Sequence, residues 1–519
     1  MSRDGQWTRV DTGCLNAALF GGALVARKLG RCHEHDPQLL RNSGFNVIEC
    51  LLLSRSPHHH CRSQRDVLSH SRLSVRHQRI TAICSALTLA AVACSTDVTS
   101  PAANDVTKIN HVVVLYLENR SFDNLYGEFS GAEGLSAATR VTQMDSLGAA
   151  YSVLPEASNG GLPLTLTNAP FPIEQYISAD KPTRDLVHRY YQEQSQIDGG
   201  KMDKFVAVSD AKGLAMGFYH TAALPLAVEA RNYTLMDHFF HSAFGGSFLN
   251  HIYLIAAAPP PFPAAPASVV AQLDASGNLL KDGAVTPDGF AVNTSYTVNA
   301  PHPATATVLV PNLTMPTIGD RLSEKNVSWA WYSGGWNDAL AGNPSALFQF
   351  HHQPFAYFAN FADGTTAKTQ HLKDEKDFLA AAAAGTLPAV SFVKPSGLEN
   401  EHPGYTDLLT GEKHVLDLIN AVRNGPNWKD AVIIVTYDEN GGFWDHVAPP
   451  VKDKWGLGTR VPTLIISPFA KRGFIDKTPY ETVSILGLIE RRWGITPLGT
   501  RDAASGDLTT AFDFTQTAP

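Results

Sequence analysis

The chain has 519 residues, of which 44% are hydrophobic and 17% charged, a composition ordinary for a globular protein with a large core. All six cysteines lie within the first 94 residues, which excludes disulfides and zinc-thiolate sites from the body that follows. That body has 29 basic and 43 acidic residues and no basic cluster interleaved with aromatic residues, so we expect no nucleic-acid partner.

The first 94 residues contain two stretches of different character. Residues 1–70 have no sustained periodicity, and we assign this extension no function. Residues 71–94 have the layout of a secretory signal, because arginines precede an apolar stretch at 80–93 and small residues precede Cys94. The apolar stretch is too short to span a bilayer comfortably. Cys94 resembles the lipid-attachment cysteine of bacterial lipoproteins, although Ala91 stands where leucine or valine is usual.

This layout predicts an exported protein that is periplasmic, secreted or anchored to a membrane through a lipid on Cys94. Such signals normally begin near the first residue, whereas this one begins late. We therefore expect either that translation starts downstream or that residues 1–70 are an upstream extension. Residues 95–108, which are small and polar and include Pro101, are interpreted as a tether before the folded body.

The body opens with the apolar, β-branched run 109–117, which predicts a strand covered on both faces in a parallel sheet. The run ends on Glu118 and Asn119. Open parallel sheets carry their sites at the carboxyl ends of their strands, so this position favours a functional carboxylate and amide. The alternative is that Glu118 is an ordinary surface residue and Asn119 an ordinary turn residue. If this pair stood alone, that alternative would be favoured.

A second apolar run, 431–437, ends on Asp438 and Glu439. If both runs are strands of one parallel sheet, the loops after them open on the same side. Glu118, Asn119 and the two downstream carboxylates would then converge. The pattern therefore predicts the start of a cation site built from oxygen ligands.

Between these two strands, a pair of glycines precedes Ser247 and allows the backbone to turn sharply. The Ser247 hydroxyl, the Asn250 amide and the His251 imidazole then lie within five residues. The simplest interpretation is a helix that starts at Ser247 with its side chain as the cap. A helix N-terminus also suits an anion, so both interpretations are compatible.

The remaining elements alternate between helix and strand, which predicts an α/β fold with a doubly wound, mostly parallel sheet and helices on both faces. We expect this domain to span 109–501, with short strands or a smaller insertion at about 259–312 and a tail at 502–519. Helices are expected at 185–194, 222–230, 372–384 and around 415–422, and the first of them includes His188. A capping box at 478–481 predicts a further helix that runs through 493. Further strands are expected at 329–332, 389–393 and 463–467.

Four motifs resemble, in order, those of the bacterial phosphoesterase family of acid phosphatases and phospholipases C. They are the segments 118–123, 246–251, 401–403 and 436–442. Each motif is weak by itself, but four in order, most of them at strand ends, form a specific signal. The resemblance covers roughly 109–501 and implies the alkaline-phosphatase-like α/β core of that family.

The resemblance also implies a role for individual residues, with Ser247 as the nucleophile that takes up the phosphoryl group. His351 and His352 are additions to which we assign no role. The cation-binding groups would be Glu118, Asn119, Ser247, Asp438 and Glu439; the histidines that contact phosphate or transfer a proton would be His188, His402 and His446; and Asn250 and His251 would contact substrate.

The implied chemistry is consistent with these residue types. A serine hydroxyl is a poor nucleophile near neutral pH, and a bound cation lowers its pKa while neutralising charge on the attacked phosphoryl group. All of the implied ligands are oxygen atoms, which favours calcium, magnesium or manganese over zinc. The partner would be a small phosphate ester or a phospholipid, with membrane contact only through a lipid anchor.

Several alternatives remain open from the sequence. The segment around Ser247 is more similar to acid phosphatases than to phospholipases C, which more often carry a threonine followed by Pro-Asn-Arg. A serine esterase would need Gly-x-Ser-x-Gly, and Leu249 stands where the last glycine belongs. A lipid-anchored binding protein that keeps the fold without activity is a third interpretation, although the nucleophile, carboxylates and histidines are all present.

The late signal-like segment leads to a direct prediction. N-terminal sequencing of the native protein is expected to show a mature chain without residues 1–70, because processing would occur next to Cys94. A mature chain that begins at Met1 would contradict both the downstream start and the processed signal.

Overall fold

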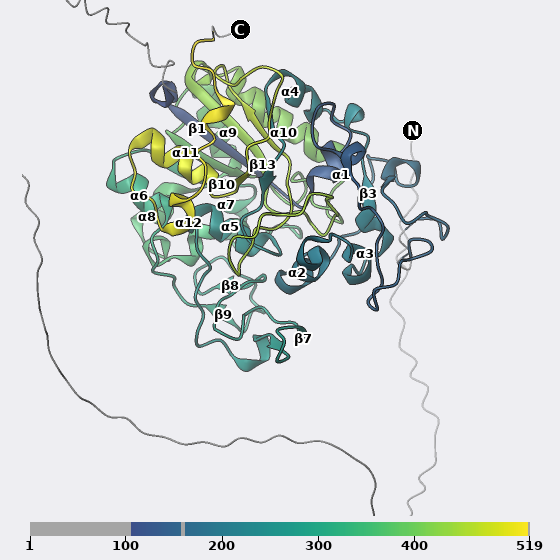
Figure 1. Cartoon of the computed structure of the whole chain (residues 1–519). Helices are drawn as coiled ribbons and strands as arrows, with labels where there is room; N and C mark the ends of the chain where they lie inside the picture. The colour runs from purple at the N-terminus through teal and green to yellow at the C-terminus, as the bar shows by residue number, and fades with distance from the viewer. Residues whose placement is uncertain (1–104, 157–160, 517–519) are drawn as a thin grey trace, which may run out of the picture. The chain divides into compact units, whose positions relative to one another are not determined.

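The body is built around one eight-stranded sheet (Figure 1). The computed structural model describes residues 105–156 and 161–516, so the predictions for 1–94 and for most of the tether lie outside the described residues. The strands follow one another across the sheet as β11 (Leu372–Asp374), β10 (Trp329–Ser333), β12 (Val390–Lys394), β1 (His111–Leu117), β13 (Ala431–Tyr437), β14 (Thr463–Ile466), β4 (Thr234–Met236) and β15 (Phe474–Asp476).

Most neighbouring strands in this sheet are parallel. Strands β11, β10, β12, β1 and β13 form a continuous parallel block, whereas β14 runs antiparallel to β13 and β4. The central strand β13 is buried along its whole length, and β1 is buried from Val112 onward. This burial explains their almost unbroken apolar sequences, because helices cover both faces of a parallel sheet.

The helices complete the doubly wound α/β fold, as the sequence predicts. Helix α9 packs against β10, β11 and β12, and α10 packs on α9, whereas α5 contacts α6 and α11 (Figure 1). None of the helices within 105–156 and 161–516 has the length and apolarity needed to cross a membrane. Their bounds are α1 Phe122–Tyr126, α2 Tyr190–Ile197, α3 Phe205–Val208, α4 Leu226–Asn232, α5 Ser247–Ala256, α6 Ile318–Glu324, α7 Trp336–Leu340, α8 Thr366–His371, α9 Glu375–Ala384, α10 Leu408–Arg423, α11 Ser484–Trp493 and α12 Thr500–Ala503.

Half of the short strands described outside the main sheet lie in the region 259–312. There β6 pairs with β7 and β8 pairs with β9, and none of these four strands joins the central sheet. The short strands are β2 Phe171–Pro172, β3 Gly217–Phe218, β5 Phe239–Phe240, β6 Gln272–Leu273, β7 Leu279–Lys281, β8 Tyr296–Thr297, β9 Leu309–Val310 and β16 Tyr480–Glu481.

Four of the predicted helices begin too early: those at 185–194, 222–230, 372–384 and 478–493 start at Tyr190, Leu226, Glu375 and Ser484. The segment 372–384 starts as strand β11, whose Leu372 pairs with Trp331, and the helix begins only after Asp374, which caps α9. The segment 185–194 is extended as far as Arg189, so His188 precedes helix α2.

The capping box proposed at 478–481 is wrong. Tyr480 and Glu481 form strand β16 beside β5, and helix α11 starts at Ser484. Tyr480 is buried, and its hydroxyl contacts Thr510 at 2.6 Å. Tertiary pairing of an aromatic residue therefore prevails over the local helix-start signal.

Candidate active site

The first carboxylates of the site follow two neighbouring strands. Strands β1 and β13 pair with Leu117 opposite Tyr437, so Glu118 and Asp438 emerge side by side. The backbone N–H of Asn119 donates to Asp438 Oδ1 at 3.1 Å, and all three polar side chains are fully buried. The structure thus brings together the two strand ends that the sequence singles out.

Ser247 opens helix α5 and faces these carboxylates. The preceding Gly245 has a φ of +89°, and a Cβ there would lie 2.4 Å from the Tyr190 backbone nitrogen, so only glycine fits this turn. Ser247 Oγ lies 3.2 Å from Glu118 Oε2 and 3.3 Å from Glu439 Oε1, and its single proton can be donated to either oxygen. The hydroxyl therefore lies between carboxylates from two different strands.

Asn119 links the carboxylates to a histidine through a strained backbone. Its φ is +62°, which is costly for a residue with a side chain and concentrates at functional sites. Asn119 Nδ2 donates to His402 Nε2 at 3.1 Å, which leaves its amide oxygen facing Glu118 Oε2 at 3.2 Å and Glu439 Oε1 at 2.6 Å. Asn119 is therefore positioned as a member of the oxygen-rich group.

His188 reaches the same group from the segment before α2. Its Nε2 lies 3.4 Å from the Asn119 amide and 3.7 Å from Glu439 Oε1. Its Nδ1 contacts the Leu186 carbonyl and lies 3.6 Å from Asp185 Oδ1. The ring is thus held on one side and directed toward the carboxylates on the other.

His402 closes the group on the side of β12. Its ring stacks on Tyr405 with centroids 3.7 Å apart, and its Nδ1 contacts the Pro403 carbonyl at 2.6 Å. Burial lowers the pKa of His402 to about 4, so the ring is neutral near pH 7.

Lys394 is a buried cation that the sequence analysis missed. It ends strand β12, is fully buried, and donates from Nζ to the Leu117 carbonyl at 3.1 Å. The same ammonium pairs with Glu118 and lies 3.6 Å from Asp438 Oδ2. Burial opposes the charge of Glu118, but Lys394 outweighs it and lowers the pKa of that carboxyl. Its position at the carboxyl end of a strand next to β1 is the signal that could have identified it.

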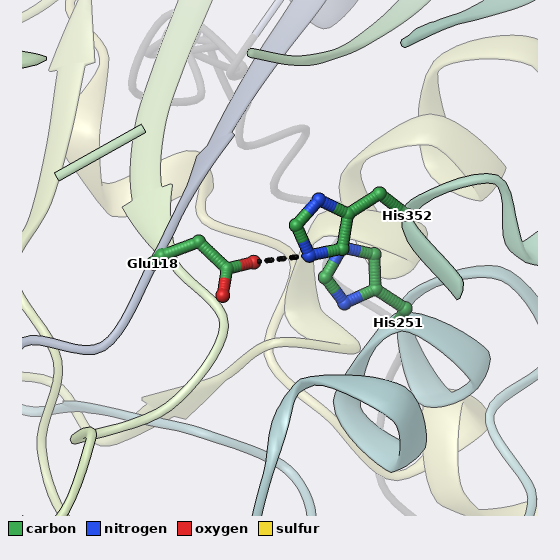
Figure 2. A group of neighbouring side chains, drawn as sticks. All are labelled: Glu118, His251 and His352. Carbon is green, nitrogen blue, oxygen red and sulfur yellow. Dashed lines mark ion pairs between the residues drawn. The ribbon is translucent and has the colours of Figure 1, made fainter. Parts of the chain in front are cut away.

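Two stacked histidines lie beside Glu118 (Figure 2). His352 Nε2 is 3.0 Å from Glu118 Oε1, and the His352 ring is parallel to the His251 ring at 5.1 Å. Burial lowers the pKa of both rings well below the usual value, and it lowers that of His351 to about 3. His352 therefore belongs to the site as a neutral ring, although the sequence analysis assigns it no role.

The donor set fits a bound divalent cation. Glu118, Asp438 and Glu439 each offer an oxygen within 4.8 Å of the others, and Asp438 Oδ2 and Glu439 Oε2 are buried without a hydrogen-bond partner. Burial and the neighbouring carboxylates raise the pKa of Asp438 and raise that of Glu439 well above its usual range. One ammonium among three buried carboxylates leaves two negative charges, which a divalent cation would neutralise.

The structure places His446 in a different group. Its Nδ1 lies 2.6 Å from Asp123 Oδ2, and Arg460 pairs with Asp123 and Asp445 in the same group. Within 105–156 and 161–516, no hydrogen bond or ion pair joins His446 to Ser247. These contacts hold His446 beside Asp123, and its expected role at the phosphate stays a prediction.

Asn250 and His251, which are expected to contact substrate, make hydrogen bonds within the fold. The Asn250 amide accepts from the Ala243 N–H and donates to the Ala243 carbonyl, both at 3.0 Å. His251 Nδ1 contacts the Ser247 carbonyl at 2.7 Å inside the fold. Both side chains are fully buried and support the segment that carries Ser247.

A pocket of about 290 Å³ opens onto Ser247. Asn293 forms part of its wall, accepts the Tyr190 N–H at 3.1 Å and donates to the Gly283 carbonyl at 2.7 Å. The region 259–312 therefore contributes directly to the wall of the pocket. The pocket is lined by Asp185, Leu186, Val187, His188, Arg189, Asp210, Gly246, Ser247, Asn293 and Thr294.

A separate group joins the loop after β12 to two helices. His414 of α10 contacts Glu375 Oε1 through Nε2 at 3.0 Å and lies 3.7 Å from Glu399 Oε1 through Nδ1. Burial opposes a charge on this ring, but the hydrogen bond and charge of Glu375, followed by Glu399 and Asp417, raise the pKa of His414. Each nitrogen of the His414 ring thus faces a carboxylate, which is the arrangement expected for a protonated, ion-paired imidazole.

Comparison with known sequences gives consistent matches across the body. The sequence profile of the family described as the Phosphoesterase family matches residues 109–496. The chain is 27% identical over 452 residues to phospholipase C A of Mycobacterium tuberculosis, covering 80% of this chain and 79% of that protein. It is 25% identical over 443 residues to a non-hemolytic phospholipase C of Pseudomonas aeruginosa, covering 78% of this chain and 57% of that protein.

Solved structures with partial similarity have low sequence identity. A lipoteichoic acid synthase from Listeria monocytogenes has a TM-score of 0.33 and 9% identity, covering 78% of this chain and 81% of that one. A protein in the alkaline phosphatase superfamily from Vibrio parahaemolyticus has a TM-score of 0.33 and 12% identity, covering 57% and 65%.

The His414 group predicts a pH-dependent contribution to stability. Folding raises the pKa of His414, so its stabilisation is complete below the unfolded pKa of about 6.5 and is lost as pH rises through the folded value. We expect the wild type and His414→Gln to differ more in free energy of unfolding at about pH 5 than at about pH 9. Urea denaturation at both values measures the difference, and an equal difference would contradict the assignment.

Proposed function

Because this chain belongs to the Phosphoesterase family and is a phosphoester hydrolase, we propose that it cleaves phosphate monoesters with Ser247 as the nucleophile. The supporting observation is the position of Ser247 Oγ, 3.2 Å from Glu118 Oε2 and 3.3 Å from Glu439 Oε1. The interpretation of Ser247 as a helix cap is wrong, because Gly246 is the N-cap of α5 and no side chain caps this helix. The Ser247 hydroxyl instead lies against two buried carboxylates, as an activated nucleophile would.

The proposed cation site consists of the oxygen donors around that hydroxyl. A divalent cation bound there would lower the pKa of the Ser247 hydroxyl and offset the negative charge of the phosphoryl group. The oxygen donors favour calcium, magnesium or manganese. The residues that would hold it are Glu118, Asn119, Ser247, Asp438 and Glu439.

In the first step, Ser247 Oγ attacks phosphorus, a serine–phosphorus bond forms, and the bond from phosphorus to the leaving oxygen breaks. The first turn of α5 directs backbone N–H groups toward the phosphoryl oxygens, because Ser247 is its first residue. The Ser247 proton passes to Glu118 or Glu439, and His188, which lines the pocket, donates a proton to the leaving alkoxide. In the second step, His188 takes a proton from the attacking water and the serine–phosphorus bond breaks. The carboxylic acid returns its proton to Ser247 Oγ, and inorganic phosphate and the free hydroxyl are released.

The pocket favours a small phosphate ester. Its volume of about 290 Å³ is near the lower limit of about 300 Å³ for small-molecule sites. The second candidate is a phospholipid, and it is supported by the relatives named phospholipase C. Relative rates on a phosphate monoester and on phosphatidylcholine distinguish the two.

We further propose that the enzyme acts outside the cytoplasm, with Cys94 as the lipid-attachment residue of an exported chain. The signal-like layout of 71–94 supports this location. A non-catalytic binding protein is disfavoured, because the buried carboxylates would destabilise the fold without contributing to a reaction.

The nucleophile assignment predicts the result of one substitution. Ser247→Ala is expected to abolish turnover of p-nitrophenyl phosphate, because among the described residues no other hydroxyl hydrogen-bonds to both Glu118 and Glu439. The melting temperature should stay close to that of the wild type, since only one oxygen is removed. A near-native rate in the folded variant would remove Ser247 from its role.

The cation assignment predicts sensitivity to chelation. Treatment with EDTA is expected to eliminate phosphatase activity. Without the cation, the negative charge of Glu118, Asp438 and Glu439 would no longer be offset, and these carboxylates would repel the phosphoryl group. Calcium, magnesium and manganese are then added singly to find which restores the rate. Activity that persists after full metal removal, verified by elemental analysis, would contradict the site.

A further inference from the structure

One buried side chain ties the turn before Ser247 to helix α2. Glu193 Oε2 accepts the Gly245 N–H at 2.6 Å, and Glu193 Oε1 accepts the Thr459 N–H at 3.1 Å. Glu193 is fully buried. Its carboxylate thus joins three segments that are remote in sequence: α2, the turn before α5 and the loop before β14.

His241 completes this group. Its Nε2 lies 2.8 Å from Glu193 Oε1, and its Nδ1 lies 2.8 Å from the Ala243 carbonyl, so the ring bridges the carboxylate and the turn. A Cβ on Gly458 would lie 2.0 Å from His241 Cε1, which leaves no space for a side chain there. The surrounding backbone therefore allows the ring little freedom.

We propose that Glu193 is a positioning residue for the nucleophile, because its carboxylate fixes the backbone of Gly245 and thereby the place of Ser247 Oγ. This inference rests on the proposed role of Ser247. Among the described contacts, Glu193 has no hydrogen bond to Ser247 and does not line the pocket, so it acts through the backbone.

The two polar groups of Gly245 are held by different side chains. Glu193 accepts its N–H at 2.6 Å, while Asn250 Nδ2 approaches its carbonyl at 3.4 Å. Asn250 also contacts the Gly246 carbonyl at 3.3 Å. Glycine can adopt many backbone conformations, including those with positive φ. The contacts of Gly245 therefore select one conformation of the turn.

The chemistry of this position requires a carboxylate. Two backbone N–H groups and one imidazole nitrogen converge on Glu193, and only a carboxylate offers two oxygens that both accept. Glutamine has the same shape but one accepting oxygen, and its NH₂ would face an N–H donor. Hydrogen bonds to an ionised acceptor are also roughly twice as strong as neutral ones.

A small displacement of the turn would affect the rate more than substrate binding. Misplacing a reacting group by about 1 Å can cost about 100-fold in rate. Substrate affinity depends mainly on the other pocket walls and on the carboxylates of the cation site, which the Glu193 side chain does not contact. A positioning role thus predicts a fall in kcat with little change in KM.

The experiment compares Glu193→Gln with Asp374→Asn in the full-length enzyme, using p-nitrophenyl phosphate. Asp374 is a matched control, because it is buried and accepts backbone N–H groups of Asn337 at 2.9 Å and Lys376 at 3.2 Å. It lies on the edge strand β11, three strands from β1. Rates are expressed per folded molecule, with folding measured by circular dichroism.

We expect Glu193→Gln to lower kcat by about 10- to 100-fold with KM changed by less than about threefold, and Asp374→Asn to leave both within about twofold. Equal losses in the two variants, or a native kcat in Glu193→Gln, would overturn the inference. A wild type without phosphatase activity would instead refute the proposed function.

A second measurement applies if Glu193→Gln does not fold. In the wild type, hydrogen exchange of the peptide that contains Gly245 is followed by mass spectrometry. The Gly245 amide is expected to exchange as slowly as those of strand β1, although it lies outside helix and strand. Exchange within seconds, as in an exposed loop, would show that Glu193 does not hold the turn and would overturn the inference.

Discussion

Mutual repulsion of buried carboxylates is the constraint on which the site depends. Glu118, Asp438 and Glu439 are fully buried and lie close together because two parallel strands end side by side. Like charges in a low-dielectric interior are tolerated only when cations or hydrogen-bond donors surround them. The lysine from β12, the Ser247 hydroxyl and the strained asparagine after β1 supply part of that compensation. A divalent cation supplies the rest in the function proposed here.

The fold and the centre of the site could be predicted because both follow local rules. Apolar, β-branched runs identify strands such as 109–117 and 431–437, and polar residues directly after them mark the functional edge of a parallel sheet. The glycine pair before Ser247 indicates a tight turn, which Gly245 makes with its positive φ. These signals need only a few consecutive residues, so they are legible without a structure.

The remaining features depend on tertiary contacts that no local pattern encodes. Lys394 matters because its strand lies next to β1, and strand order across a sheet is not written in any single segment. His446 follows the Asp438 motif closely in sequence, yet Arg460 and Asp123 turn it into a separate ion-pair group. A strand forms at Tyr480 in place of the predicted helix start because this residue pairs with Phe239 of β5. Each of these cases involves segments far apart in the chain.

The wall of the pocket comes from a part of the chain that the central sheet does not include. Asn293 and Thr294 belong to the region of short strands at 259–312, whereas Ser247 and the carboxylates belong to the sheet and to α5. Part of the pocket wall and the proposed nucleophile thus come from separate pieces of polypeptide. Evolution can remodel that outer region by insertion or deletion and change which esters are accepted, while the hydrolytic machinery is inherited intact.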